Sequence, residues 1–146
     1  MKQQRAIGFE IKCLSNMIRR KLDTTFSSPE FDGLTGAQNA MMGYIMDHEE
    51  TQDIFQKDIE EEFIRRSSAT VMLQGLEQRG YIRRTQIEKD ARLKKIELTE
   101  KARKLQKRVR SEIDRFHEQL EKDLSKEEKE EFFRLLDKIK SNLKEA

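Results

Sequence analysis

The chain of 146 residues contains little cysteine, histidine or glycine, and each shortage excludes a class of site. Cys13 is the single cysteine, so no disulfide forms within the chain and no cysteine cluster holds a metal. The two histidines, His48 and His117, are far apart in the sequence, which argues against a structural zinc site. The six glycines occur singly, and neither a phosphate-binding glycine loop nor a nucleophile–base–acid set is present. The sequence therefore predicts no enzyme, no metal site and no cofactor.

Long hydrophobic runs are also missing. No stretch of about 18 apolar residues occurs, and charged residues interrupt the N-terminal segment 1–12, so neither a membrane span nor a signal peptide is predicted. We therefore expect a cytoplasmic protein that does not contact a membrane. Charged residues make up 40% of the sequence and hydrophobic residues 35%. This balance favours a single elongated or helix-rich domain over a compact globule.

The segment 54–101 has the pattern of two short helices, a basic hairpin and the start of a long helix at Thr99. In 54–63 the apolar residues follow helical spacing, and three glutamates occupy the opposite side. In 64–82 a second apolar stripe leaves polar residues on the other faces, and Gly80 directly after Arg79 is a typical left-handed helix end. We expect the second of these helices to enter a DNA major groove.

The following segment predicts a β-hairpin. Residues 81–87 and 93–98 combine β-branched and large apolar residues with Arg, Thr, Gln and Lys, as in strands with one wet face. The polar residues 88–92 between them are predicted to form the tip. Helix, helix and basic hairpin in this order predict a winged helix-turn-helix, which binds double-stranded DNA.

Charge is divided sharply along this part of the chain. From residue 65 to residue 95 there are nine basic and three acidic residues, a net charge of +6. From residue 47 to residue 62 there are eight acidic residues and one lysine, a net charge of −7. A total of +2 hides this division. A polyanion would be attracted to one segment and repelled by the other, so the chain would bind it in one orientation.

Three short motifs resemble the MarR family of bacterial transcription regulators. Residues 90–92, Asp-Ala-Arg, resemble the family's wing signature; 98–101, Leu-Thr-Glu-Lys, its next helix start; and 76–82 its recognition-helix exit. Val71 differs, because the family often has a basic residue there. Ala102 replaces a frequent glycine, and the turn around Ile64 is one residue short. The resemblance implies a mainly α fold with a small β-hairpin wing: one MarR-type domain over 1–146, with a DNA-binding lobe at 34–98 and dimerisation helices at 1–26 and 99–146.

The terminal segments also carry apolar stripes. Helical spacing of apolar residues predicts helices at about 5–26, from Thr35 onward, and from 102 to 120, and Ser125 with Glu128 forms a capping box that opens the last one. One winged domain of about 70 residues cannot cover the stripes of the first helix and of the last two helices, so we expect a second copy of the chain to do so. A twofold dimer would place its recognition helices about 34–36 Å apart, which predicts a near-palindromic operator.

Candidate base and phosphate contacts lie on the polar faces of 64–82. For Arg65, Arg66 and Thr70 the alternative is a solvated helix face, and we favour DNA contact. The two serines either cap the helix or hold phosphate. The glutamine one turn beyond Thr70 bonds either adenine or water. The full set is Arg65, Arg66, Ser67, Ser68, Thr70, Val71 and Gln74.

The predicted wing contributes the remaining DNA candidates. The resemblance implies that Arg92 reaches a minor groove while Asp90 braces the hairpin, and the alternative is an ordinary polar turn. The other basic residues are expected to contact the DNA backbone, so that they affect affinity without changing sequence preference. These are Arg83, Arg84, Lys94 and Lys95.

Four residues are candidates for an effector pocket. Some relatives sense oxidants through a lone thiol on the first helix, near Cys13 and Met17, although a lone cysteine on a helix is more often a small core residue. Met41 lies in a methionine cluster next to Tyr44, where adaptable side chains either line a pocket or pack the core.

The sequence thus predicts a homodimeric transcription regulator, more often a repressor than an activator in this family, that a small-molecule effector releases from DNA. The alternative is a winged-helix or coiled-coil adaptor that binds another protein and no DNA. Salt dependence separates the two functions, because affinity for a duplex falls steeply with salt.

Overall fold

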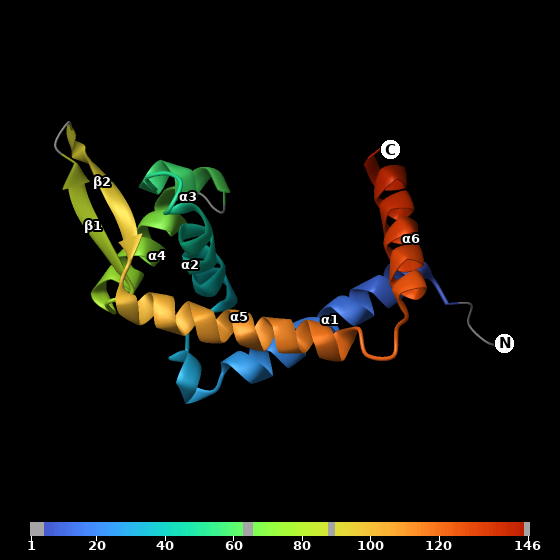
Figure 1. The fold of residues 1–146 in the computed structure, drawn as a ribbon. Coiled ribbons are helices and arrows are strands. Elements are labelled where there is room, and N and C mark those ends of the chain that lie inside the picture. The colour runs from blue at the N-terminus through green and yellow to red at the C-terminus, as the bar shows by residue number, and fades with distance from the viewer. Residues whose placement is uncertain (1–4, 63–65, 88–89, 145–146) are drawn as a thin grey trace. The chain divides into compact units, whose positions relative to one another are not determined.

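The computed structural model describes residues 5–62, 66–87 and 90–144, and the side chains of residues 66, 67, 90 and 91 also lie outside the description. The chain divides into two compact units, Met1–Val109 and Arg110–Ala146. Figure 1 shows the element order. It is α1 Ile7–Phe26, η1 Pro29–Phe31, α2 Gly36–His48, α3 Gln56–Glu62, α4 Arg66–Gln78, β1 Ile82–Ile87, β2 Asp90–Leu98, α5 Glu100–Leu120 and α6 Lys126–Lys144.

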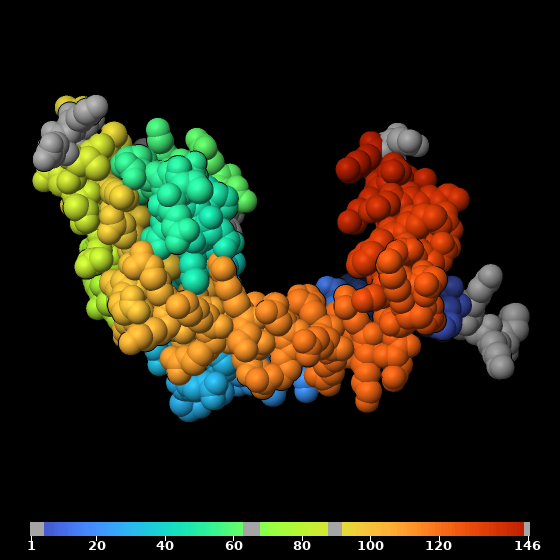
Figure 2. Space-filling view, viewed as in Figure 1, coloured from blue at the N-terminus to red at the C-terminus, as the bar shows by residue number. Residues whose placement is uncertain are grey.

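The first unit contains the predicted winged helix-turn-helix, and the predicted fold class is confirmed. β1 and β2 form an antiparallel two-stranded sheet. The hairpin packs against α3 and α4, and β2 also contacts α2. In the space-filling view the atoms of α2, α3 and the hairpin lie against one another (Figure 2). Buried side chains from α2, α3, α4, both strands and the first turns of α5 make the core.

Local sequence signals set most of the element boundaries. Thr35 caps α2 in a capping box with Gln38, whose backbone N–H donates to Thr35 Oγ1 at 3.1 Å. At α6 the Ser125–Glu128 capping box forms as expected, with the two bonds at 2.9 and 3.0 Å. These side chains satisfy N–H groups that have no partner within a helix.

The predicted position of the hairpin tip is wrong. The strand β2 begins at Asp90 rather than at residue 93, so the expected tip residues 90–92 belong to the strand. The register slips between Gln86 and Ile87, and Ile87 pairs with Asp90 while Gln86 pairs with Lys94. The alternation of apolar and polar residues marks only the part of a strand that packs against a core. Beyond that core the ladder continues through charged residues.

Helices α1 and α6 bury no side chain among the described residues. Large apolar side chains on both helices are exposed, in contrast to the closed core of α2, α4 and the hairpin. On α1 they are Ile7, Phe9, Ile11, Leu14 and Met17, and on α6 Phe132, Phe133, Leu135 and Leu143. Within the described part of the chain, no helix has the length and apolar character to span a membrane.

Gly80 ends α4 in the left-handed conformation, with φ +81°, as the sequence predicted. The backbone N–H of Tyr81 donates to Leu76 O at 2.9 Å, and that of Gly80 to Glu77 O at 3.0 Å. These two bonds satisfy the last carbonyl groups of the helix and turn the chain into β1.

We expect Gly80→Ala to lower the free energy of unfolding by more than about 1 kcal/mol, because an L side chain is strained at this φ. Chemical denaturation would measure the change. Gly8→Ala is the control, since Gly8 has no positive φ and no chain atom would contact its added Cβ. An unchanged midpoint for Gly80→Ala would contradict the prediction.

Candidate nucleic-acid interface

Helix α4 presents one face to the core and the opposite face to solvent. Ala69, Leu73 and Leu76 are fully buried. At about 100° per residue, the face opposite to these three contains Val71, Gln74 and Gln78, and all three are exposed. Of the predicted contacts on this helix, Ser68, Val71 and Gln74 are therefore accessible to a bound duplex. Arg65 and the side chains of Arg66 and Ser67 lie outside the described residues.

Thr70 lies on the flank of α4 that faces α3. The side-chain amide of Gln56 donates to Thr70 Oγ1 at 2.8 Å and to Glu60 Oε1 at 3.0 Å. Thr70 is half-buried, and its hydroxyl group braces the two helices. A hydroxyl group engaged in this way fixes the angle at which α4 is presented, whether or not it also contacts a base.

The basic residues of the hairpin fall into two groups. Arg83, Arg92 and Lys94 are exposed. Arg84 has only 19% of its side chain exposed, and its Nε lies 3.3 Å from Glu77 Oε2. Lys95 Nζ lies 3.2 Å from both Asp53 Oδ1 and Glu97 Oε1.

Arg84 and Lys95 are thus held by acidic residues of the chain. Hydrogen bonds to Asp53 and then to Glu97 raise the pKa of the Lys95 ammonium group. The sequence grouped Arg83 with Arg84, but neighbouring strand residues point to opposite faces, and Arg84 shares the face of the buried Ile82 and Ile96. The side chain of Asp90 lies outside the described residues.

A small cavity of about 160 Å³ brings three of these predicted residues together with one that sequence reasoning missed. Its lining includes Arg84, Arg92 and Lys94 from the hairpin and Lys57 from α3. Arg84 Nη2 is buried without a hydrogen-bond partner among the described residues, whereas Nε makes the ion pair with Glu77. Lys57 is the single basic residue in an acidic stretch of sequence, and that isolation was the signal that could have identified it.

The side chain of Tyr81 joins the end of α4 to the segment before α2. Its hydroxyl group donates to Asp32 Oδ2 at 2.5 Å, and the guanidinium group of Arg79 donates to the backbone carbonyl of Asp32 at 2.5 Å. Lys101 Nζ lies 4.4 Å from the centre of the Tyr81 ring and donates to Arg79 O at 2.9 Å. Burial, and then the hydrogen bond to the Asp32 carboxylate, raise the pKa of Tyr81 to about 12.

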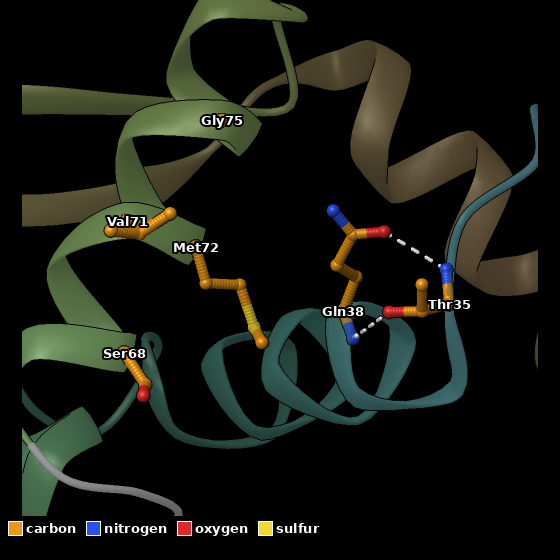
Figure 3. Close-up of a pocket in the computed structure, with 6 residues that line it drawn as sticks. All are labelled: Thr35, Gln38, Ser68, Val71, Met72 and Gly75. Carbon is orange, nitrogen blue, oxygen red and sulfur yellow. Dashed lines mark hydrogen bonds between the residues drawn. The ribbon is translucent and has the colours of Figure 1, made fainter.

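An open groove of about 630 Å³ runs between the N-terminus of α2 and α4 (Figure 3). Thr35 and Gln38 line one side, joined by the two hydrogen bonds of the capping box. The other side is lined by four residues of α4, and the Met72 side chain points across toward α2. The four are Ser68, Val71, Met72 and Gly75.

The four predicted effector residues lie on α1 and α2. Cys13 and Met17 are exposed on α1. On α2, Met41 is buried in the core and Tyr44 is half-buried, with its ring centre 4.2 Å from that of His48. The groove in Figure 3 is lined by other residues. Among the described residues, no group of three or more His, Cys, Asp or Glu side chains is placed to hold a metal ion.

Residues 32–93, which include α2, α3, α4 and β1, match the model of the MarR family. Comparison with curated protein sequences finds no match.

Solved structures are similar over nearly the whole chain. MepR of Staphylococcus aureus, a transcription regulator of the multidrug efflux pump MepA, has 26% identity, 95% coverage of this chain and 99% of its own, and a TM-score of 0.79. MepR solved with DNA has 27% identity, 96% and 99% coverage and a TM-score of 0.77. The heme sensor PefR of Streptococcus agalactiae, solved with heme, has 21% identity, 95% coverage of both chains and a TM-score of 0.74, a likeness of fold alone.

The Tyr81–Asp32 bond predicts an alkaline transition. A hydroxyl group whose pKa is raised from 10 to about 12 stabilises the fold fully below pH 10 and loses that contribution as the pH rises toward 12. The chain has two tyrosines. In Tyr44→Phe the remaining tyrosine should titrate, by ultraviolet absorbance, near pH 12 rather than near pH 10. Tyr44→Phe/Asp32→Asn is the control and should titrate lower. A midpoint near pH 10 in the folded Tyr44→Phe protein would contradict the prediction.

Proposed function

We propose that this chain is a cytoplasmic repressor of the MarR family of DNA-binding transcription regulators, and that it binds a near-palindromic operator as a homodimer. A small-molecule effector releases it from DNA. The observation that carries the proposal is the pairing of an exposed helix face, Ser68, Val71 and Gln74, with the exposed hairpin cations Arg83, Arg92 and Lys94. The likeness to MepR, which was solved with DNA, supports it.

The mechanism follows from the division of roles between helix and hairpin. The outer face of α4 carries donors and acceptors of the kind that recognise base edges in a major groove. The hairpin cations neutralise phosphate groups and contact the flanking minor groove. The acidic residues of the segment 47–62 repel the duplex, so the lobe docks with its basic segment toward the DNA.

The dimer is proposed from the exposed apolar side chains of α1 and α6. A monomer in water would leave these side chains unburied, at a cost of about 25 cal/mol for each Å² of apolar surface. A second copy of the chain offers the same apolar stripes, and a twofold axis buries both at once. Two recognition helices about 34–36 Å apart then fit successive major-groove faces.

For the effector we propose a site formed by residues of α1 and α2, which include Cys13, Met17, Met41 and Tyr44. An effector that changes the distance between the two lobes of the dimer would weaken both major-groove contacts together. Met41 is buried in the core, and α2 also lines the groove against α4. A shift of α2 is thereby transmitted to the DNA-binding helix.

Selection of bound duplexes from a random DNA pool, followed by a salt titration of the enriched sequence, tests the function. We expect an inverted repeat with half-sites about one helical turn apart and an affinity that falls steeply with salt. Absence of any enriched duplex at low salt would overturn the proposal in favour of a protein-binding adaptor, for which the exposed apolar side chains of α6 would be the surface.

Arg92→Ala should weaken binding to every duplex and reduce the slope of log affinity against log salt by about 1, because one phosphate contact is lost. Fluorescence anisotropy at several salt concentrations measures the slope. Arg5→Ala is the control, since Arg5 is exposed and pairs with Glu10 outside the DNA-binding lobe. An unchanged slope for Arg92→Ala would remove this arginine from the interface.

Leu136→Asp should dissociate the homodimer, because a buried carboxylate without a partner is strongly unfavourable. Sedimentation velocity would report a monomer. Lys138→Asp places the same charge at an exposed position of α6 and should leave the dimer intact. A Leu136→Asp protein that still sediments as a dimer would show that this part of α6 is not in the interface.

A further inference from the structure

The exposed face of α4 has an unusual composition for a helix that binds DNA. Between residues 68 and 78 its exposed positions are Ser68, Val71, Gln74, Glu77 and Gln78, none of which is a cation. Val71 leaves 70% of its surface in solvent. A β-branched residue is a poorer helix former than most polar residues, and an isolated exposed valine gains no burial from the fold. Helix stability therefore does not explain this valine.

Val71 also forms the rim of the groove in Figure 3, together with Gly75 one turn further along α4. A Cβ atom added to Gly75 would meet no other atom of the chain within 4 Å. Its backbone has no positive φ. The fold therefore gives no reason for a glycine in the middle of this helix, where glycine is less favourable than alanine. The position beside Gly75 is therefore open to a molecule other than this chain.

We propose that Val71 recognises the 5-methyl group of a thymine in the major groove, and that Gly75 provides the clearance that lets the duplex approach α4 this closely. The inference rests on the proposed DNA-binding function and specifies part of its sequence preference. The occupant is double-stranded DNA because the same lobe carries the exposed cations Arg83, Arg92 and Lys94.

Base chemistry explains why thymine is the partner. Among the four bases, thymine alone presents a methyl group in the major groove, and a valine side chain has no donor or acceptor with which to recognise the others. Gln74, three residues further on the same face, has an amide group able to pair with adenine N6 and N7. The two side chains together favour a step that contains A·T pairs.

The charge of α4 supports a role in base discrimination rather than in general affinity for DNA. With no cation among the exposed positions 68–78, this part of α4 contributes little to the sequence-independent attraction, which the hairpin cations provide. Exclusion of water between two apolar groups then provides discrimination, and burial of one methyl group corresponds to about 0.8 kcal/mol, or about a fourfold change in affinity.

Uracil scanning of the selected operator tests the inference. Each thymine is replaced in turn by deoxyuridine, which removes only the 5-methyl group. We expect one symmetry-related position at which the replacement weakens binding of the wild-type protein about fourfold per half-site. In Val71→Ala the loss at that position should disappear, while losses at all other positions stay unchanged. Thr51→Ser is the control for removal of an exposed methyl group, since Thr51 lies between α2 and α3, and it should keep the full thymine preference.

Gly75→Ala tests the clearance. Because the added methyl group meets no chain atom, this substitution should raise the melting temperature. It should at the same time weaken operator binding severalfold, since the methyl group points into the groove. A more stable protein with unchanged operator affinity would overturn the role of Gly75.

The outcomes separate this inference from the function on which it rests. The recognition of thymine by Val71 would be overturned if uracil changed the affinity for the enriched operator at no position. It would also be overturned if Val71→Ala were as sensitive to uracil as the wild-type protein. In both cases the DNA-binding function would stand. If the random pool yields no enriched duplex, the proposed function and this inference fall together.

Discussion

The junction around Tyr81 is the constraint on which the DNA-binding lobe depends. The residue is buried and its backbone N–H bonds to the last turn of α4. Its carbonyl accepts from the backbone N–H of Thr99 at 3.0 Å, and its hydroxyl group reaches Asp32. Thr99 in turn caps α5 and donates to Gly80 O at 2.7 Å. The end of α4, both ends of the hairpin, the start of α5 and the segment before α2 are therefore fixed against one another at one point.

Fixing these segments together has a functional consequence. A helix in a major groove and a hairpin in a minor groove bind one duplex only if the angle between them is maintained. The brace from Gln56 to Thr70 holds the other side of α4 against α3. Contacts within the chain, rather than contacts to DNA, thus prepare the binding geometry in advance, and association does not have to order it.

The distribution of charge depends on the same packing. Lys95 and Arg84 are engaged by acidic residues of the chain, whereas Arg83, Arg92 and Lys94 are exposed to solvent. Arg83 Nη2 lies 3.9 Å from Glu97 Oε2, a contact that solvent screens. The cations that face a polyanion are therefore a subset of those in the sequence. In the interface proposed above, the hairpin cations provide affinity and the outer face of α4 provides base preference.

The sequence by itself determined the order of the elements, the helix caps at Thr35 and Ser125, and the left-handed turn at Gly80, because each of these signals acts over three to five residues. The tertiary structure alone decided which cations remain exposed, where β2 begins, and that Tyr81 bonds to a carboxylate 49 residues away. It also revealed the groove beside Val71, which forms only when α2 and α4 pack together. Periodicity and motif order report local conformation and the buried face of each element, whereas such pairings arise between segments that are distant along the chain.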